Sequence, residues 1–182
     1  MSGMVILDRD GVINEDSDDY IKSPEEWVPI NGSLEAINRL KKAGYQVTVA
    51  SNQSGLARGL FDQQTLDRIH DKMRSLLAQR GASVDGVFYC PHGPNDNCLC
   101  RKPKPGLLLQ IAKQFSITLK DVVFVGDTLA DVQAARMAGA RPVLVRTGKG
   151  QRTLDKNGSL EGVPVYDNLA QFVREFLKSD HG

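Results

Sequence analysis

The chain has 182 residues, 41% of them hydrophobic, and this length is close to that of one ordinary domain. Its 23 Lys and Arg residues nearly balance 22 Asp and Glu residues, and the net charge of +1 argues against nucleic acid or an anionic membrane as the partner. No apolar run approaches the roughly 20 residues of a membrane span, and the N-terminus lacks a signal-peptide pattern. We therefore expect a single cytoplasmic domain over residues 1–182 that acts on a small charged substrate.

Apolar and amphipathic segments alternate along the chain. In chain order, we expect a strand at Val5 to Leu7, a helix at Leu34 to Lys42, a strand at Gln46 to Ala50, a helix at Gln63 to Arg80, a strand at Gly86 to Tyr89, a helix at Leu107 to Phe115, a strand at Val122 to Val125, a helix at Ala130 to Ala138, a strand at Pro142 to Val145 and a helix at Leu169 to Leu177. Because the strands are short continuous apolar runs separated by helices, the pattern predicts an α/β fold with a doubly wound parallel sheet of Rossmann-like type.

Each expected strand is followed directly by a polar motif. The motifs are, in order, DRDG, SNQSG, CPHG, GDT and RTGKG. Parallel strands end at one edge of a sheet, and open α/β sheets bind their ligands at this edge. The sequence therefore predicts one site that gathers groups from these motifs.

The DRDG motif places Asp8 and Asp10 two residues apart, so that an extended chain directs both carboxylates to one side. Two such carboxylates repel each other unless a cation is present, and Mg²⁺ is the oxygen-seeking ion that also neutralises phosphate. One Asp can then attack phosphorus while the other serves as acid and base. The alternative interpretation of this motif alone is a surface turn rich in Asp.

Three further motifs offer groups for a phosphate site. SNQSG supplies hydroxyl and amide donors, although an ordinary polar loop has the same composition. The prolines of RKPKPG make a stiff loop that presents Lys102 as a fixed charge, and the alternative is a solvated basic loop. In GDTLAD, Asp127 can complete a magnesium shell, whereas Asp131 either stabilises the first turn of a helix or contacts the metal.

All three cysteines lie between residues 90 and 100, together with one histidine. Cys90 and His92 form one pair with a single residue between them, and Cys98 and Cys100 form the other. These four ligands form a closed tetrahedral set for structural Zn²⁺, and the alternative is three reduced thiols beside a chance histidine. Since the cluster ends directly before Arg101, we expect the zinc-bound loop to direct Arg101 and its neighbour Lys102 toward the phosphate.

Taken together, DRDG, SNQSG, RKPKPG and GDTLAD resemble, in order and position, the four motifs of the haloacid dehalogenase superfamily of phosphatases. The resemblance implies that Asp8 is the covalent nucleophile, that Asp10 is the acid and base, and that Ser51 and Lys102 hold the phosphoryl group. It also implies Mg²⁺ bound by Asp8, by Asp127 and by the backbone carbonyl of Asp10. Asp131 would lie at the edge of this shell or just outside it.

Within the superfamily, the zinc loop and the strings DRDGVIN, NQSGLARG, CRKPKPG and RTGKG resemble the heptose bisphosphate phosphatases along nearly the whole chain. That family removes the 7-phosphate of a heptose 1,7-bisphosphate on the route to the activated heptose of lipopolysaccharide. The resemblance implies substrate contacts at Asp16, Asn52, Gln53, Ser54 and Arg101, with Arg58 as a candidate for the second phosphate. Histidinol-phosphate phosphatase is the alternative, because it has the same zinc ligands and the loop length does not separate the two.

The spacing of the motifs leaves no room for a cap domain. We therefore expect an open site in a monomer, with the substrate selected by the segment Glu15 to Trp27 and by the zinc loop. A binding module on an inactive scaffold would lack an essential group, and the motifs lack none. A nucleic-acid 3′-phosphatase is disfavoured by the balanced charge and by the absence of a basic stripe with stacking aromatics.

Overall fold

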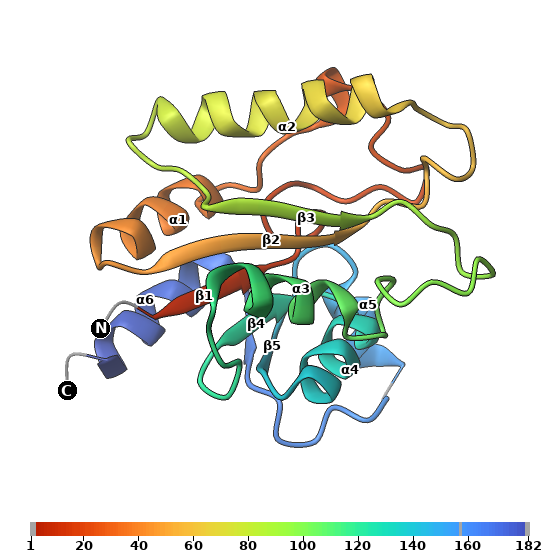
Figure 1. Cartoon of the computed structure of the whole chain (residues 1–182). Coiled ribbons are helices and arrows are strands. Elements are labelled where there is room, and N and C mark those ends of the chain that lie inside the picture. Colours follow the sequence, from red (N-terminus) through yellow and green to blue (C-terminus); the bar gives the residue numbers. More distant parts are fainter. Residues whose placement is uncertain (1–2, 157, 181–182) are drawn as a thin grey trace.

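The computed structural model describes residues 3–156 and 158–180. Its centre is a six-stranded sheet in the spatial order β3-β2-β1-β4-β5-β6, in which every neighbouring pair is parallel (Figure 1). The strands are β1 (Met4–Leu7), β2 (Gln46–Asn52), β3 (Gly86–Cys90), β4 (Val123–Gly126), β5 (Arg141–Val145) and β6 (Val165–Tyr166). This is the strand order of a Rossmann-type sheet, so the expected doubly wound parallel sheet is confirmed.

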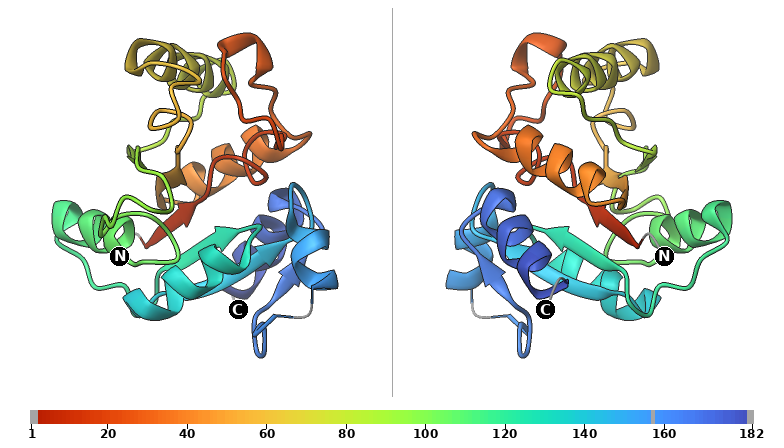
Figure 2. Two further views of the ribbon diagram at one scale, coloured as in Figure 1. Left: turned by 90° about the vertical axis from the view of Figure 1, so that its right-hand side faces the viewer. Right: turned by 90° about the vertical axis from the view of Figure 1, so that its left-hand side faces the viewer.

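Helices lie on both sides of the sheet (Figure 2). They are α1 (Ser33–Lys42), α2 (Gln63–Ala78), α3 (Gly106–Phe115), α4 (Leu129–Ala138), α5 (Gly150–Asp155) and α6 (Leu169–Asp180), with a short 3-10 helix η1 (Pro24–Glu26). In β1, Val5 and Leu7 pack in one core with α1, α2 and α6, whereas Ile6 packs in the other core with α3 and α4. Successive strand side chains point to opposite faces, and burial of both faces explains why the strands are continuous apolar runs.

The strand order reverses between β1 and β4. From β1 the chain adds β2 and β3 on one side, and it then crosses to add β4, β5 and β6 on the other. Asp8 directly follows β1 and its backbone N donates to the carbonyl of Val125 in β4 at 2.9 Å. Asp127 directly follows β4. The reversal therefore brings two of the predicted site residues to the crevice where sheets of this type bind ligands.

Each expected strand and helix is present, with shifted ends. Helix α1 begins at Ser33, one residue before the expected start at Leu34, and Gly32 caps it with a φ of 86°, a left-handed conformation that suits glycine. A serine in front of a helix often acts as its cap, but the Ser33 hydroxyl donates to the carbonyl of Val12 at 2.8 Å. Helix α2 ends at Ala78 rather than Arg80, and α6 continues to Asp180. The sequence does not predict α5 or β6, because six and two residues are too short to show a period.

The segment of residues 15–27, which we call the flap, follows β1 and is anchored at its far end. Trp27 is fully buried, and Lys72 of α2 donates to the backbone carbonyls of Pro24 and Trp27 at 2.6 and 2.7 Å. Between β2 and β3 the chain contains α2 as its regular element. Among the helices of the described residues, none combines the length and the apolar character that a membrane crossing requires.

Candidate active site

A cavity of about 330 Å³ opens at the carboxyl edge of the sheet. Six carboxylates and three cations dominate its lining. The lining residues are Asp8, Asp10, Asp16, Ser17, Asp18, Tyr20, Asn52, Ser54, Arg101, Lys102, Asp127, Thr128, Ala130, Asp131 and Lys149. The motifs after β1, β2, β4 and β5 therefore meet as predicted, whereas the CPHG motif after β3 does not line the cavity.

Three buried carboxylates converge at the base of this cavity. Asp8, Asp127 and Asp131 each place an oxygen within 4.8 Å of the other two. Asp131 lies in the first turn of α4, where its carboxylate accepts hydrogen bonds from the backbone N of Asp127 and of Thr128, both at 3.1 Å. Asp131 therefore stabilises the first turn of α4, as the third residue of a capping box whose N-cap is Thr128, and it also lies in the carboxylate group. A group of this kind can hold a divalent cation.

The three carboxylates repel one another, and this repulsion affects their pKa values. Burial, with the Asp131 carboxylate as the next cause, raises the pKa of Asp127 to about 8. Burial and Asp131 also raise the pKa of Asp8 well above its ordinary value, although Lys102 opposes this shift. Asp131 itself stays ionised, because the effect of burial is outweighed by Lys102, which lowers its pKa. The site therefore favours a further positive charge beside Asp8 and Asp127.

Lys102 is the buried cation of the site, with only 3% of its surface exposed. Its Nζ lies 3.1 Å from Asp8 Oδ1 and 2.7 Å from Asp131 Oδ1, and it donates to the carbonyl of Ala50 at 3.0 Å. Burial lowers the pKa of Lys102, but the two carboxylates outweigh it and the pKa is raised overall. Asn52 holds the backbone of Lys102 by accepting from its N at 3.0 Å and donating to its carbonyl at 3.1 Å. The lysine is therefore a fixed point charge beside Asp8.

Asp10 lines the cavity but its carboxylate is not part of the group formed by Asp8, Asp127 and Asp131. It accepts hydrogen bonds from Arg9 Nε at 2.9 Å, from Asn14 Nδ2 at 2.9 Å and from Gln53 Nε2 at 3.2 Å. Burial raises the pKa of Asp10, but the charge and hydrogen bonds of Arg9, with those of Asn14 and Gln53, hold it below the ordinary value. Asp10 is therefore a well-oriented carboxylate in this state.

The SNQSG motif divides into residues that line the cavity and residues behind it. Asn52 and Ser54 line the cavity. Ser51 is 1% exposed and its hydroxyl accepts from Gln53 Nε2 at 2.8 Å. Neither Ser51 nor Gln53 lines the cavity in this state, and Gln53 instead links Ser51 to Asp10. This link is a contact that the sequence does not reveal.

The two arginines expected to bind the substrate differ in position. Arg101 lines the cavity, and its Nη1 donates to the carbonyl of His92 at 3.4 Å. Arg58 is exposed and is not part of the lining. Its guanidinium carbon lies 5.7 Å from the ring centre of Tyr20, a flap residue that does line the cavity. The structure therefore brings Arg101 into the site and leaves Arg58 at its rim.

Two ion pairs join the flap to the start of α5. Lys149 Nζ lies 2.9 Å from Asp16 Oδ2, and Arg152 makes a two-pronged contact with Asp18 at 3.1 and 3.2 Å. The expected substrate residue Asp16 thus lies in the cavity, beside a lysine that the sequence reasoning missed. The signal was present, because Lys149 belongs to the RTGKG motif at the end of β5.

Two glycines enclose the Asp127 carboxylate. A side chain at Gly11 or at Gly148 would collide with Asp127 Oδ2, and a side chain at Gly148 would also collide with the backbone of Gly11. The Thr147 hydroxyl donates to the Gly11 carbonyl at 2.7 Å, and the Lys149 backbone N donates to Asp127 Oδ2 at 2.8 Å. The loop after β5 therefore packs directly on the DRDG loop and fixes the direction of Asp127.

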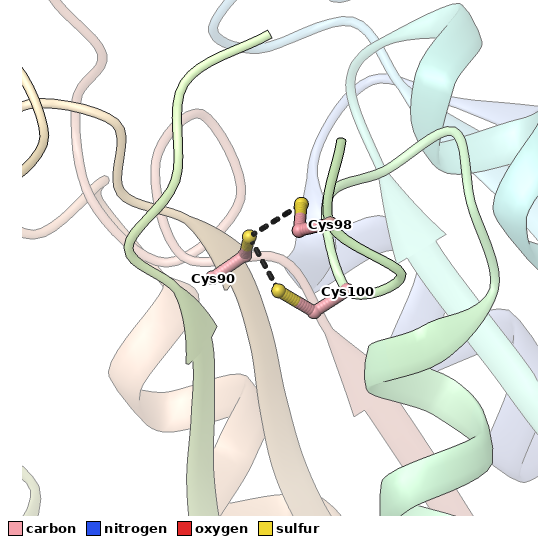
Figure 3. A group of neighbouring side chains, drawn as sticks. All are labelled: Cys90, Cys98 and Cys100. Atoms are coloured by element: carbon pink, nitrogen blue, oxygen red, sulfur yellow. Dashed lines mark hydrogen bonds between the residues drawn. The ribbon is translucent and has the colours of Figure 1, made fainter. Parts of the chain in front are cut away.

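The three cysteines gather in one cluster (Figure 3), and the last of them, Cys100, directly precedes Arg101. Cys90 Sγ lies 3.6 Å from Cys98 Sγ and 2.6 Å from Cys100 Sγ. The sequence predicts His92 as the fourth member, but its ring nitrogens are not within 4.8 Å of all three sulfur atoms. His92 is exposed on the loop after β3. The structure thus brings together three of the four predicted metal ligands.

Known proteins resemble this chain over nearly its whole length. Residues 99–172 match a family model described as HAD-hydrolase-like. The chain is 53% identical over 175 residues to the D-glycero-beta-D-manno-heptose-1,7-bisphosphate 7-phosphatase of Bordetella bronchiseptica, covering 96% of this chain and 98% of that protein. It is 55% identical over 174 residues to the protein of the same name in Pseudomonas putida, covering 96% and 99%.

Solved structures give the same result. The D,D-heptose 1,7-bisphosphate phosphatase of B. bronchiseptica, crystallised in complex with magnesium and phosphate, matches with a TM-score of 0.96 and 52% identity over 98% of this chain and 99% of that chain. The corresponding phosphatase of Burkholderia thailandensis matches with a TM-score of 0.78 and 45% identity over 97% and 99%. The chain therefore belongs to the family of HAD-like hydrolases named D-glycero-beta-D-manno-heptose-1,7-bisphosphate 7-phosphatase.

Proposed function

We propose that this chain removes the 7-phosphate of D-glycero-β-D-manno-heptose 1,7-bisphosphate through a covalent intermediate on Asp8. The observation that carries the proposal is the buried group in which Asp8 lies 3.1 Å from Lys102 Nζ and beside the carboxylates of Asp127 and Asp131. The substrate is inferred from relatives that are 45% to 55% identical and carry this name. Histidinol phosphate, the alternative, is not favoured because these relatives all bear the heptose name.

The carboxylate group suits magnesium. Its oxygens are the hard ligands that this ion prefers, and its three negative charges exceed what Lys102 alone can balance. We propose Asp8, Asp127 and the backbone carbonyl of Asp10 as ligands, while Asp131 pairs with Lys102 and caps α4. When bound, the ion neutralises phosphate charge and so reduces its repulsion of the attacking carboxylate.

Asp8 and Asp10 divide the chemistry between them. The Asp8 carboxylate attacks phosphorus, the bond between phosphorus and the sugar oxygen breaks, and that oxygen takes a proton from Asp10. Asp10 then takes a proton from water while the water oxygen attacks the aspartyl phosphate, which restores both side chains. The first step needs a protonated Asp10, and a phosphate dianion beside it would favour that form over the carboxylate.

The remaining residues bind the substrate in this proposal. Lys102 neutralises the phosphoryl oxygens, and Asn52 and Ser54 supply donors from the cavity wall. Ser51 is assigned to the phosphoryl group, which requires its buried hydroxyl to turn toward the cavity, and Gln53 supports Ser51 and Asp10 from behind. Asp16 and Arg101 line the cavity and are assigned to the sugar and its distal phosphate. Arg58, which lies beside Tyr20 at the rim, is assigned to a phosphate that projects beyond the cavity.

We also propose that Cys90, Cys98 and Cys100 bind a structural zinc ion, with His92 as the fourth ligand. The 3.6 Å between the sulfur atoms of Cys90 and Cys98 is close to the distance of about 3.8 Å between two thiolates on a tetrahedral zinc. The 2.6 Å between the sulfur atoms of Cys90 and Cys100 is shorter, so the assignment also requires these two atoms to separate. His92 is exposed, and the assignment requires its side chain to turn toward the sulfur atoms. The ion would hold the loop that positions Arg101.

The setting of the enzyme completes the proposal. We assign the chain to the cytoplasm, as a single-domain monomer in the synthesis of the activated heptose of the lipopolysaccharide core. A phosphorylated sugar is charged and remains in the compartment where it is made. One continuous sheet carries the groups of the cavity, which supports a single domain.

Initial rates of the magnesium-loaded protein test the proposal. The substrates are heptose 1,7-bisphosphate, histidinol phosphate and a 3′-phosphorylated oligonucleotide, and we expect the heptose to be preferred. Asp8→Asn keeps the size of the side chain and removes the attacking charge, so kcat falls by several powers of ten. Asp71→Asn is the matched control, because it makes the same change at an exposed residue of α2 that does not line the cavity. Substantial activity of Asp8→Asn would show that no covalent intermediate forms there.

A further inference from the structure

A buried histidine outside the cavity contacts the residue between the two motif aspartates. His70 lies on α2 and is 3% exposed, and Arg9 is fully buried. The His70 Nε2 atom lies 3.1 Å from Arg9 Nη1. His70 does not line the cavity, and its ring packs against Tyr89 of β3 with 5.9 Å between ring centres. A residue 61 positions away in sequence is thus in direct contact with the DRDG motif.

The chemistry of the two side chains fixes the direction of this contact. A guanidinium has donors and no acceptor, so Arg9 donates and His70 Nε2 accepts. An imidazole that accepts at Nε2 is neutral and carries its proton on Nδ1. Burial, together with the charges of Arg9 and Arg74, lowers the pKa of His70 to about 3, so the ring is neutral near pH 7. His70 is therefore a permanent acceptor for Arg9 under working conditions.

The other side of the same guanidinium holds Asp10. Arg9 Nε donates to Asp10 Oδ1 at 2.9 Å, and Arg9 Nη2 donates to Asp10 Oδ2 at 3.2 Å. The planar guanidinium thus lies between a neutral acceptor from α2 and the carboxylate that faces the cavity. If the acceptor is removed, a buried N–H of Arg9 loses its partner, and this cost favours rotation of the guanidinium toward another acceptor. Any such turn moves Asp10, because both of its oxygens bond to Arg9.

We propose that His70 is a positioning residue for the acid and base step, acting through Arg9 on Asp10. This inference rests on the proposed function, in which the Asp10 proton goes to the sugar oxygen as the bond to phosphorus breaks. The buried face of α2 is otherwise apolar, with Leu66, Ile69, Met73 and Leu77. A histidine on this face is accounted for by the hydrogen bond to Arg9, which an apolar residue cannot make.

The leaving group distinguishes this role from simple packing. A sugar alkoxide departs only with a proton, whereas p-nitrophenolate departs without one. The value of kcat/KM reports the steps up to and including departure of the leaving group. A poorly placed acid therefore lowers kcat/KM on the sugar phosphate and leaves kcat/KM on the aryl phosphate nearly unchanged. A purely structural defect lowers the two kcat/KM values by the same factor. We therefore compare His70→Leu with His70→Gln, whose amide oxygen can accept the bond from Arg9, and use Met73→Leu as the control on the same helix face.

His70→Leu is expected to lower kcat/KM about 10- to 100-fold on heptose 1,7-bisphosphate and less than about threefold on p-nitrophenyl phosphate, a fraction of what a general acid contributes. His70→Gln should restore most of the loss. His70→Met replaces His70→Leu if the latter does not fold. Equal losses on both substrates, or no rescue by Gln, would overturn the inference.

Asp10→Asn serves as the reference that separates this inference from the proposed function. It should show the same dependence on the leaving group, with a larger loss on the sugar phosphate. If Asp10→Asn shows the dependence and His70→Leu does not, the inference alone is wrong. If Asp10→Asn lowers kcat/KM by the same factor on both substrates, the acid role of Asp10 is wrong, and the inference about His70 is wrong with it.

Discussion

Magnesium binding should weaken steeply with acidity, because protons and the ion compete for the same carboxylates. Burial and the Asp131 carboxylate raise the pKa of Asp127 to about 8, and a carboxylate must be ionised to bind the ion. Asp127 is about half ionised at pH 8 and about 1% ionised at pH 6, so the apparent affinity should fall about 50-fold, or about 2.3 kcal/mol. The raised pKa of Asp8 acts in the same direction. Affinity should therefore rise with pH and level off above about pH 8.

Isothermal titration of magnesium into the zinc-loaded protein measures this effect. Titrations in two buffers with different ionisation enthalpies give the number of protons released, which should be about one or more per ion near pH 6 to 7. Asp71→Asn is the control, since Asp71 does not line the cavity and is not among the causes of the Asp127 shift, and its profile should match that of the unchanged protein. An affinity that stays constant between about pH 6 and pH 8 would refute the reasoning.

Three further results are expected. Arg101→Ala should mainly raise KM for the bisphosphate, because the guanidinium is proposed to bind the substrate. Lys102→Ala should lower kcat on every substrate, and equal losses of kcat in the two variants would contradict this division of roles. Metal analysis should find about one zinc per chain, and Cys98→Ser should lose this zinc. A mild chelator should remove the activity, and added magnesium should restore it. If protein from cells grown with ample zinc contains none, the zinc site is excluded. Between pH 7 and pH 5, His70→Gln should lose less of its free energy of unfolding than the unchanged protein loses. The folded pKa of His70 is about 3 against an ordinary value of 6.5, so the stability that neutral His70 contributes is present above about pH 6.5 and decreases as the pH falls. About 2 kcal/mol of it is lost at pH 5, which urea unfolding at pH 7 and pH 5 can measure; equal losses in both proteins would contradict the pKa.

The sequence predicts the sheet and most of the cavity because both depend on local patterns. The five expected strands contain continuous apolar runs, and the polar motif after each run fixes which residues reach the carboxyl edge. The sequence does not predict helix α5 or strand β6, because both are too short to show a hydrophobic period. Ser33 is a plausible cap by residue type, but the backbone at Gly32 requires a left-handed conformation that sequence type alone does not reveal.

Contacts between distant segments account for what the sequence does not show. Lys149 is visible as a cation, but its pairing with Asp16 depends on how the flap folds against α5. His70 is visible as a polar residue on an apolar helix face, yet nothing in the sequence identifies Arg9 as its partner. His92 has the expected spacing for zinc, whereas its direction depends on side-chain torsions that spacing does not set.

The enclosure of Asp127 by Gly11 and Gly148 has a consequence for how the protein folds. The two glycines are 137 residues apart in the chain, and they meet only when β1, β4 and β5 have assembled side by side. A partly folded chain can contain Asp8 and Asp127 and still lack the loop that directs the second carboxylate. Capture of magnesium during refolding should therefore coincide with docking of β5, which makes ion binding a late and specific marker of the completed sheet.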